Sequence, residues 1–107
     1  MRWLYHILAG EIPQQDHFAP PSLSREGFIH ASYREAVLDS ARLHFPAGAA
    51  LRVLRINPRL LGVPVLEADT PRGPMPHIHG AIPLAAIQGV HALDEFAADA
   101  ALPDWIA

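Results

Sequence analysis

The sequence predicts a single α+β domain over residues 1–107, with about six short strands in a mostly antiparallel or mixed sheet and one main helix after the second strand. Three observations predict this class. A length of 107 residues is typical of one domain. The 11 prolines, about twice the usual share of ~5%, divide the chain into short elements. Apolar residues at clear helical spacing occur in residues 32–45.

The first half of the chain carries two expected strands and the main helix. Residues 2–8, RWLYHIL, alternate partly and are rich in aromatic and branched side chains, which is typical of strands. Residues 9–26 contain three prolines and many polar residues, which predicts a long loop with room for a turn of helix. Residues 27–32, GFIHAS, form the second strand. The helix over 32–45 has an apolar stripe of Val37, Leu38, Ala41 and Phe45.

The second half is expected to alternate short strands with turns. Its predicted elements are a strand at 50–56, a turn at 57–62, a strand at 63–69, an irregular loop at 70–76, a strand at 77–82, a helical turn at 83–87 and a last strand at 89–93. Residues 94–107 form a C-terminal tail. Its large apolar residues predict that the tail docks on the domain, and these are Phe96, Leu102, Trp105 and Ile106.

The composition excludes several classes of function. There are no cysteines, and therefore no disulfide or thiolate nucleophile. The formal net charge is −3, and the sequence has no blocks of like charge. It therefore lacks the basic surface that binds nucleic-acid backbones, and an RNA end is the one nucleic-acid partner left open. No apolar run approaches the ~20 residues of a membrane span, and the first is too short for a secretory signal. We expect a cytoplasmic monomer or weak homodimer that binds a small molecule and no membrane.

The stretch GFIHAS places a histidine beside the start of the helix. Because successive strand side chains point to opposite faces, Phe28, His30 and Ser32 share one face. The segment SYRE matches a capping box, in which Ser32 caps the helix and Glu35 reaches back. The free N–H groups of a helix N-terminus favour an anion. His30 is therefore a candidate site residue, with a buried and hydrogen-bonded core histidine as the alternative.

Two further histidine sites lie on predicted strands. His77 and His79 are two residues apart in MPHIHG and therefore point the same way, and Gly80 permits close approach of a backbone. His6 lies in the middle of the first strand. Three strand-borne histidine sites in so small a domain can line one cleft. The other histidines are expected to be structural, and these are His17, His44 and His91.

The same histidines raise the question of a metal and of other polar groups. Imidazoles bind zinc, but the closely spaced helical pairs of zinc hydrolases are missing from the sequence, so no metal is expected. An anion such as a pyrophosphate could lie at the Ser32 helix end with Arg25 or Arg72, which otherwise are solvated loop charges. No single carboxylate stands out as catalytic among the candidates Glu11, Asp16, Glu26, Glu67 and Asp69.

Several segments together resemble a known family. LYHI, PPSLSREGFIHAS, the helix, LRVLRINPRLLG and PHIHGAIPLAAI occur in the order and at the spacing of the small bacterial family called domain of unknown function 952, over about residues 3–93. EGFIHAS and the later PH-x-x-G are the most specific parts. The family is similar at fold level to ADP-ribosyltransferases, particularly to the histidine-rich branch that includes the tRNA 2'-phosphotransferases.

This resemblance implies two small, strongly bent, mostly antiparallel sheets around a cleft for NAD or an ADP-ribosyl group. It implies that His6 holds a ribose hydroxyl and that His30 meets the nicotinamide-side ribose. His77 falls at the third position, where active transferases usually keep a glutamate. His30 and His77 are then the candidate catalytic residues. The candidate ligand-binding residues are His6, Phe28, Ser32, His79 and Gly80.

Three function classes remain open. A histidine in place of the glutamate favours a pocket that binds NAD, ADP-ribose or a related ribose phosphate with weak or no NAD turnover. The alternative is an active ADP-ribosyl or 2'-phosphate transferase. A third class is a phosphoesterase with two histidines as acid and base, or a histidine-only metal site. Such phosphoesterases carry paired His-x-Ser/Thr motifs, whereas this chain has one, HAS.

Overall fold

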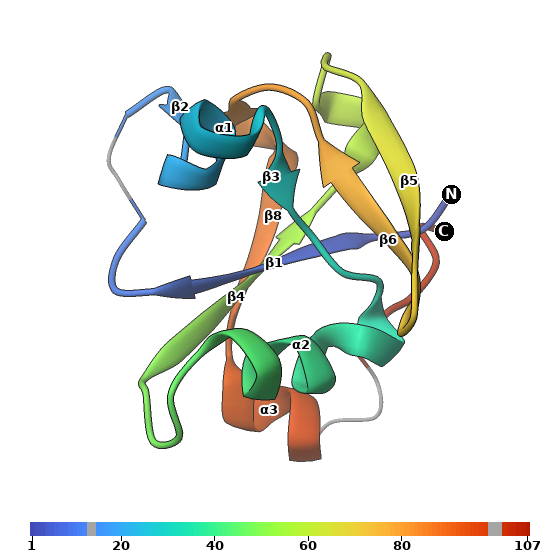
Figure 1. The fold of residues 1–107 in the computed structure, drawn as a ribbon. Helices are drawn as coiled ribbons and strands as arrows, with labels where there is room; N and C mark the ends of the chain where they lie inside the picture. Colours follow the sequence, from blue (N-terminus) through green and yellow to red (C-terminus); the bar gives the residue numbers. More distant parts are fainter. Residues whose placement is uncertain (13–14, 99–101) are drawn as a thin grey trace.

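The computed structural model describes residues 1–12, 15–98 and 102–107 (Figure 1). It is an α+β domain with antiparallel sheets, and its longest described helix is α2. The strands are β1 Leu4–Ala9, β2 His17–Phe18, β3 Ile29–His30, β4 Leu51–Ile56, β5 Val65–Thr70, β6 Gly73–Ile78, β7 Ile82–Pro83 and β8 Ile87–Ala92. The α-helices are α1 Pro21–Glu26, α2 Val37–His44 and α3 Leu93–Ala98, and the 3-10 helices are Arg34–Ala36, Pro58–Leu60 and Leu84–Ala86.

The strands form two three-stranded sheets and one two-stranded pair, with every described pairing antiparallel. One sheet has the order β1-β4-β8, and the other has the order β3-β6-β5. In the second sheet His30 pairs directly with His77. The two sheets meet through β1, because the backbones of Tyr5 and Ser32 exchange hydrogen bonds of 2.8 and 2.7 Å. This junction brings the middle of β1 close to the end of β3.

The segment after β1 contains more structure than the loop expected for residues 9–26. Of this segment, residues 13 and 14 lie outside the described residues. His17 pairs with Pro83 to form the β2–β7 ribbon, and α1 follows. Pro21 fits the first turn of α1, where a missing N–H costs nothing. Gly27 ends the helix at φ 85°, a left-handed conformation that glycine adopts without strain, and turns the chain into β3.

The irregular loop expected at residues 70–76 is wrong. Thr70 pairs with Gly73, so Pro71 and Arg72 form a two-residue turn between β5 and β6. Proline favours the second position of such a turn, and Gly73 takes a φ of 99°. Strand β6 therefore starts at Gly73 and carries His77 near its end.

The capping box predicted at Ser32 is also wrong. The chain stays extended through Tyr33, and α2 begins only at Val37, with no side-chain cap. The backbone pairing between Ser32 and Tyr5 holds residue 32 in a bridge and directs its hydroxyl inward, where it hydrogen-bonds Ser40 at 3.0 Å. Glu35 makes an ion pair with Arg2 instead of reaching back to residue 32.

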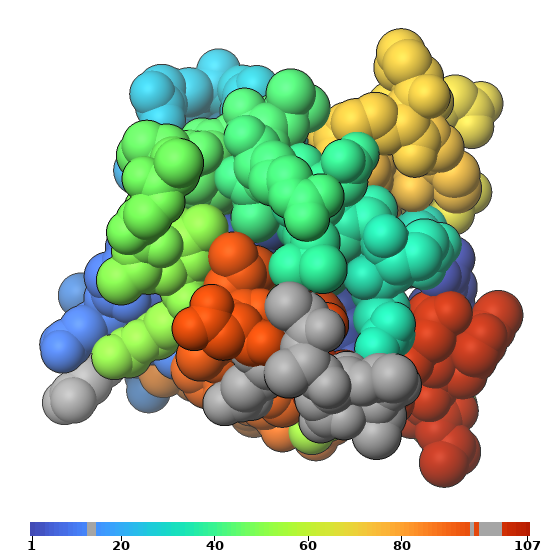
Figure 2. Space-filling model, turned by 90° about the horizontal axis from the view of Figure 1, so that it is seen from below, coloured from blue at the N-terminus to red at the C-terminus, as the bar shows by residue number. Residues whose placement is uncertain are grey.

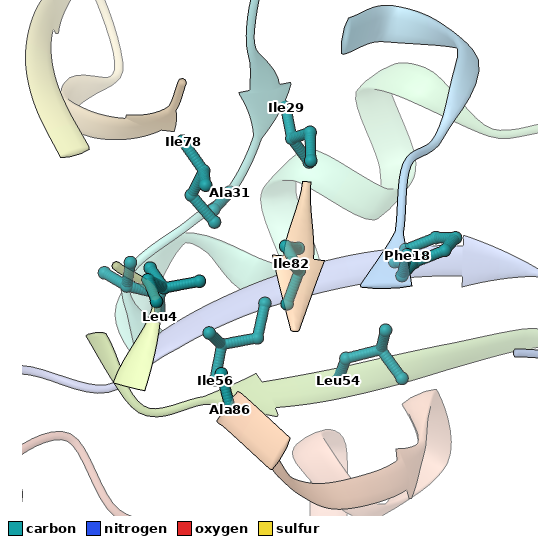
Figure 3. Packing of buried hydrophobic residues seen from close by; sticks show 10 residues of the cluster. Leu4, Phe18, Ile29, Ala31, Leu54, Ile56, Ile78, Ile82 and Ala86 are labelled. Atoms are coloured by element: carbon teal, nitrogen blue, oxygen red, sulfur yellow. The ribbon is translucent and has the colours of Figure 1, made fainter. Parts of the chain in front are cut away.

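Two clusters of buried residues hold the elements together. Figure 3 shows the larger one, in which side chains from both sheets meet. Its members include Leu4, Phe18, Ile29, Leu54, Ile56, Leu61, Ile78 and Ile82. The smaller cluster joins α2 and α3 to β1 and β4 through Tyr5, Val37, Val53, Phe96 and Leu102. In Figure 2 the two helices lie side by side on the face seen from below.

The C-terminal tail docks as the sequence predicts, within the part that the structure describes. Phe96 and Leu102 are buried, and Arg2 pairs with Asp104 at 2.8 Å, next to a backbone bond from Trp3. Trp105 remains 64% exposed. Residues 99–101 of the tail lie outside the described residues. No described helix has the length and the apolar run needed to cross a membrane.

Candidate functional site

A cleft of ≈ 690 Å³ opens beside β1. Its walls come from β1, α1, the end of β3, α2, the β5–β6 turn and β6. This volume lies within the range of ligand-binding pockets, which is ~300–1,000 Å³. Four of the residues predicted for the site line it, namely His6, His30, Ser32 and His77.

His6 forms the floor of this cleft. Its side chain is 9% exposed, and its ring packs edge-on against Phe18. Nδ1 lies 2.7 Å from the His30 carbonyl oxygen, which can only accept, so Nδ1 carries the proton. Burial lowers the pKa of His6, and the hydrogen bond to His30 offsets this only in part. A neutral His6 therefore has its Nε2 available as an acceptor.

His30 and His77 line the cleft from the paired strands β3 and β6. Their ring centroids lie 5.6 Å apart with the rings nearly perpendicular, as expected for directly paired residues of two strands. Half of the His30 side chain, 51%, is exposed, and its Nε2 lies 2.8 Å from a carboxylate oxygen of Glu26. Burial and the neighbouring His30 and His79 lower the pKa of His77. At neutral pH the His77 ring is therefore uncharged.

Three predicted site residues do not line the cleft, namely Phe28, His79 and Gly80. The ring of Phe28 stacks on His77 with centroids 3.9 Å apart, so it supports that imidazole from behind. His79 lies past the end of β6, where its backbone N–H donates to Pro64. Gly80 is required for packing, because a Cβ there would lie 2.5 Å from a methyl carbon of Val63.

Several polar residues of the cleft were not selected from the sequence. His44 was expected to be structural, yet it lines the cleft 6.2 Å from the His30 ring. Its pKa is lowered by burial and by the nearby Arg72 and His30. Ser40 also lines the cleft, although it lies on the buried side of α2 with Val37 and Ala41. A serine on the otherwise apolar face of a predicted helix is the feature of the sequence that could have indicated this role for Ser40.

The charged residues of the cleft are few. Of the candidate carboxylates, Glu26 lines it, whereas Glu67 accepts a hydrogen bond of 2.6 Å from Tyr33 outside it. Burial and this bond to Glu67 raise the pKa of Tyr33 to about 12. Arg25 and Arg72 line the cleft from α1 and from the β5–β6 turn. Among the described residues, no group of three histidine or carboxylate side chains could hold a metal ion.

Comparison with known proteins decides the family. A family model described as "Protein of unknown function (DUF952)" matches residues 9–90, which is more than half of the chain. The chain belongs to the DUF952 family. This DUF952 protein also resembles the crystal structure of protein CC0527 from Caulobacter crescentus, with a TM-score of 0.70 and 21% identity over 84% of each chain.

A double mutant of the same Caulobacter protein matches equally well, with a TM-score of 0.70 and 20% identity over 84% of each chain. At this identity the likeness shows that this chain and the Caulobacter protein share a fold. No curated protein matches the sequence.

Proposed function

We propose that this DUF952 protein binds NAD, ADP-ribose or a related ribose phosphate in the cleft beside β1, and that it turns NAD over weakly or not at all. The observation that carries the proposal is the convergence of His6, His30 and His77 with Arg25 and Arg72 in one cleft of ≈ 690 Å³. Imidazoles and guanidinium groups together suit a ligand that combines hydroxyls with phosphates.

The histidines suit the sugar part of such a ligand. A neutral imidazole has one donor and one acceptor nitrogen, and a ribose hydroxyl can pair with either. His6 offers an acceptor from β1, and His30 and His77 offer further nitrogens from β3 and β6. Sites that hydrogen-bond hydroxyls from both sides select sugars strongly over apolar analogues.

The positions of these residues support an ADP-ribosyltransferase-like arrangement as part of the proposal. His6 lies on the first strand, His30 follows the first helix, and His77 lies on a strand paired with β3. This order agrees with the first, second and third site positions that the family resemblance implies. A cleft lined by strands of two small antiparallel sheets also supports this arrangement, because the family resemblance implies such a cleft.

The weak turnover follows from the charge at the third position. Cleavage of the nicotinamide–ribose bond passes through an oxocarbenium-like state, which a nearby carboxylate stabilises. His77 is uncharged at neutral pH and supplies no negative charge there. Among the described residues that line the cleft, the acidic one is Glu26, and its carboxylate lies 2.8 Å from His30 Nε2.

A second candidate function is an acid–base phosphoesterase. It is favoured by the 5.6 Å separation of the His30 and His77 rings, because two imidazoles at that distance can flank one phosphodiester, with Glu26 orienting His30. Hydrolysis of a 2',3'-cyclic nucleotide by the purified protein, lost in His30→Ala and His77→Ala variants, would establish this function in place of the first.

The proposed function is tested by calorimetry with ADP-ribose and by assay of nicotinamide release from NAD. We expect saturable binding of ADP-ribose, at least tenfold weaker in His30→Ala, and slow or undetectable nicotinamide release. His17→Ala is the matched control, since this exposed histidine lies outside the cleft. Rapid nicotinamide release that depends on His30 would contradict weak turnover, and no heat at millimolar ADP-ribose would contradict the binding.

A further inference from the structure

Arg72 is fixed over the cleft by the β5–β6 turn. The Thr70 hydroxyl accepts from the Arg72 backbone N–H at 3.2 Å and donates to the Gly73 carbonyl at 2.7 Å. In Figure 1 this turn lies close to the segment that enters α2. The side chain of Arg72 is 28% exposed and reaches α2, where Nη1 donates to the Ser40 hydroxyl at 3.0 Å.

The Ser40 hydroxyl belongs to a buried chain of hydrogen bonds. Ser40 and Ser32 are 4% and 5% exposed, and their hydroxyl oxygens lie 3.0 Å apart. Because Ser40 accepts from Arg72, its own proton is available for Ser32. Ser32 in turn is fixed to β1 by its two backbone bonds to Tyr5. The guanidinium group of Arg72 is thus connected to β1 through the hydrogen bonds of Ser40 and Ser32.

The charge of Arg72 is only weakly compensated. Asp39, its ion-pair partner, lies 3.9 Å away with a 64% exposed side chain, so solvent screens this pair strongly. Arg25 lines the same cleft and has no ion pair or hydrogen bond with another described residue. His44 also lines the cleft, and the charge of Arg72 is one of the causes that lower its pKa. The cleft therefore carries two guanidinium groups, one from α1 and one from the β5–β6 turn, while Glu26 is engaged by His30.

We propose that Arg72, Ser40 and His44 form a phosphate subsite of the cleft, which recognises the phosphate or pyrophosphate of the ligand while His6, His30 and His77 hold its sugar. This inference rests on the proposed function and specifies which end of the cleft takes the anion. The guanidinium of Arg72 keeps free N–H groups beside the one bound to Ser40, and a phosphate oxygen can accept from them. The His44 imidazole can donate to the same group when it gains a proton.

The test compares three ligands by calorimetry, namely ADP-ribose, adenosine and inorganic pyrophosphate, with wild type and with Arg72→Ala. Arg59→Ala is the matched control, because this exposed arginine lies on the 3-10 helix Pro58–Leu60 outside the cleft. We expect Arg72→Ala to weaken ADP-ribose and pyrophosphate about 10- to 100-fold and to leave any adenosine binding unchanged, with Arg59→Ala like wild type. Arg72→Lys should bind with an intermediate affinity, because a lysine keeps the charge without the planar fork.

The possible results separate the two proposals. If ADP-ribose binds equally to wild type and Arg72→Ala, the phosphate subsite is wrong and the proposed ligand stands. If ADP-ribose fails to bind but pyrophosphate binds through Arg72, the subsite stands and the proposed ligand is wrong. If none of the three ligands binds at millimolar concentration, both are wrong. Should Arg72→Ala fail to fold, Arg72→Lys and Arg72→Gln decide in the same way, since wild-type affinity for pyrophosphate in both would overturn the subsite.

Discussion

The carboxylate of Glu26 lies 2.8 Å from Nε2 of His30, at the junction between α1 and β3. A carboxylate only accepts hydrogen bonds, so Nε2 of His30 carries the proton and Nδ1 is the basic nitrogen of the neutral ring. Gly27, Phe28 and Ile29 separate the two residues in sequence, and Gly27 ends α1. The link therefore sets both the tautomer and the orientation of the histidine that the proposed function needs most.

Replacement of Glu26 by Gln should disturb the ligand more than the fold. Both side chains are about half exposed, so loss of the ion pair should change the free energy of unfolding by less than ~1 kcal/mol. Affinity for ADP-ribose should fall severalfold, because the His30 ring loses its fixed orientation. Urea unfolding and calorimetry measure the two effects, with Glu11→Gln as the control outside the cleft. Unchanged affinity in Glu26→Gln would show that the pair does not orient His30 for binding.

The histidines whose pKa values are lowered in the folded chain should make stability fall in mild acid. The pKa of His6 is lowered by burial, and the pKa values of His44 and His77 are lowered chiefly by burial as well. Above the ordinary value of ~6.5, the folded and unfolded chains are both neutral at these positions and stability is fully present. As the pH falls below ~6.5, the unfolded chain binds protons first, and the free energy of unfolding decreases.

The size of this effect is measured by urea unfolding between pH 5.5 and 8. Each histidine that titrates only in the unfolded chain contributes a slope of up to ~1.4 kcal/mol per pH unit. His6→Gln should reduce this slope by up to ~1.4 kcal/mol per pH unit, which corresponds to one proton. His17→Gln changes an exposed position and should leave the slope unchanged. An unchanged slope in His6→Gln would contradict a neutral, buried His6.

Gly80→Ala should destabilise the fold by about 1–3 kcal/mol, because the added Cβ would lie 2.5 Å from a Val63 methyl carbon. Val63→Ala removes both methyl carbons but keeps the Cβ of residue 63, 2.8 Å from the added carbon, so the double variant should recover part of the loss and be more stable than the sum of the two single changes predicts. The measurement is a double-mutant cycle by chemical denaturation. Strict additivity, together with a loss of ADP-ribose affinity in Gly80→Ala, would instead support the ligand-binding role first predicted for Gly80.

Ser32 and Ser40 should be energetically coupled. Each single Ala variant is expected to cost about 1–2 kcal/mol, since it leaves the other buried hydroxyl with one partner fewer. The double variant should cost less than the sum by on the order of 1 kcal/mol. Costs that add without coupling, with helix content reduced in Ser32→Ala alone, would favour a helix cap at Ser32.

Much of the fold could be predicted from local pattern. The run LRVLRI, rich in branched apolar residues, forms the largely buried strand β4, and the apolar stripe containing Val37 and Ala41 forms the buried side of α2. The failures occurred where distant segments compete with local signals. Ser32 has the sequence of a helix cap, but pairing with Tyr5, which is far away in the chain, keeps it extended.

The site was predictable to the extent that it depends on strands. Direct pairing of His30 with His77 brings both rings to one wall, as their alternation indicated. Phe28 shares that side but lies behind His77, because β3 has only two residues. The contributions of His44 and Arg72 depend on how α2 and the β5–β6 turn pack across the cleft. No spacing within one segment encodes that arrangement.

The central claim is that His6, His30 and His77 line one ribose-phosphate site, and an NMR titration with ADP-ribose tests it most directly. Imidazole resonances assigned by His→Gln variants report on each ring separately. We expect saturable shifts at His6, His30 and His77 that share one dissociation constant, with none at His17 and His91, which lie outside the cleft. Equal shifts at all of these rings, or no shift at His6, His30 and His77 with millimolar ADP-ribose, would contradict it.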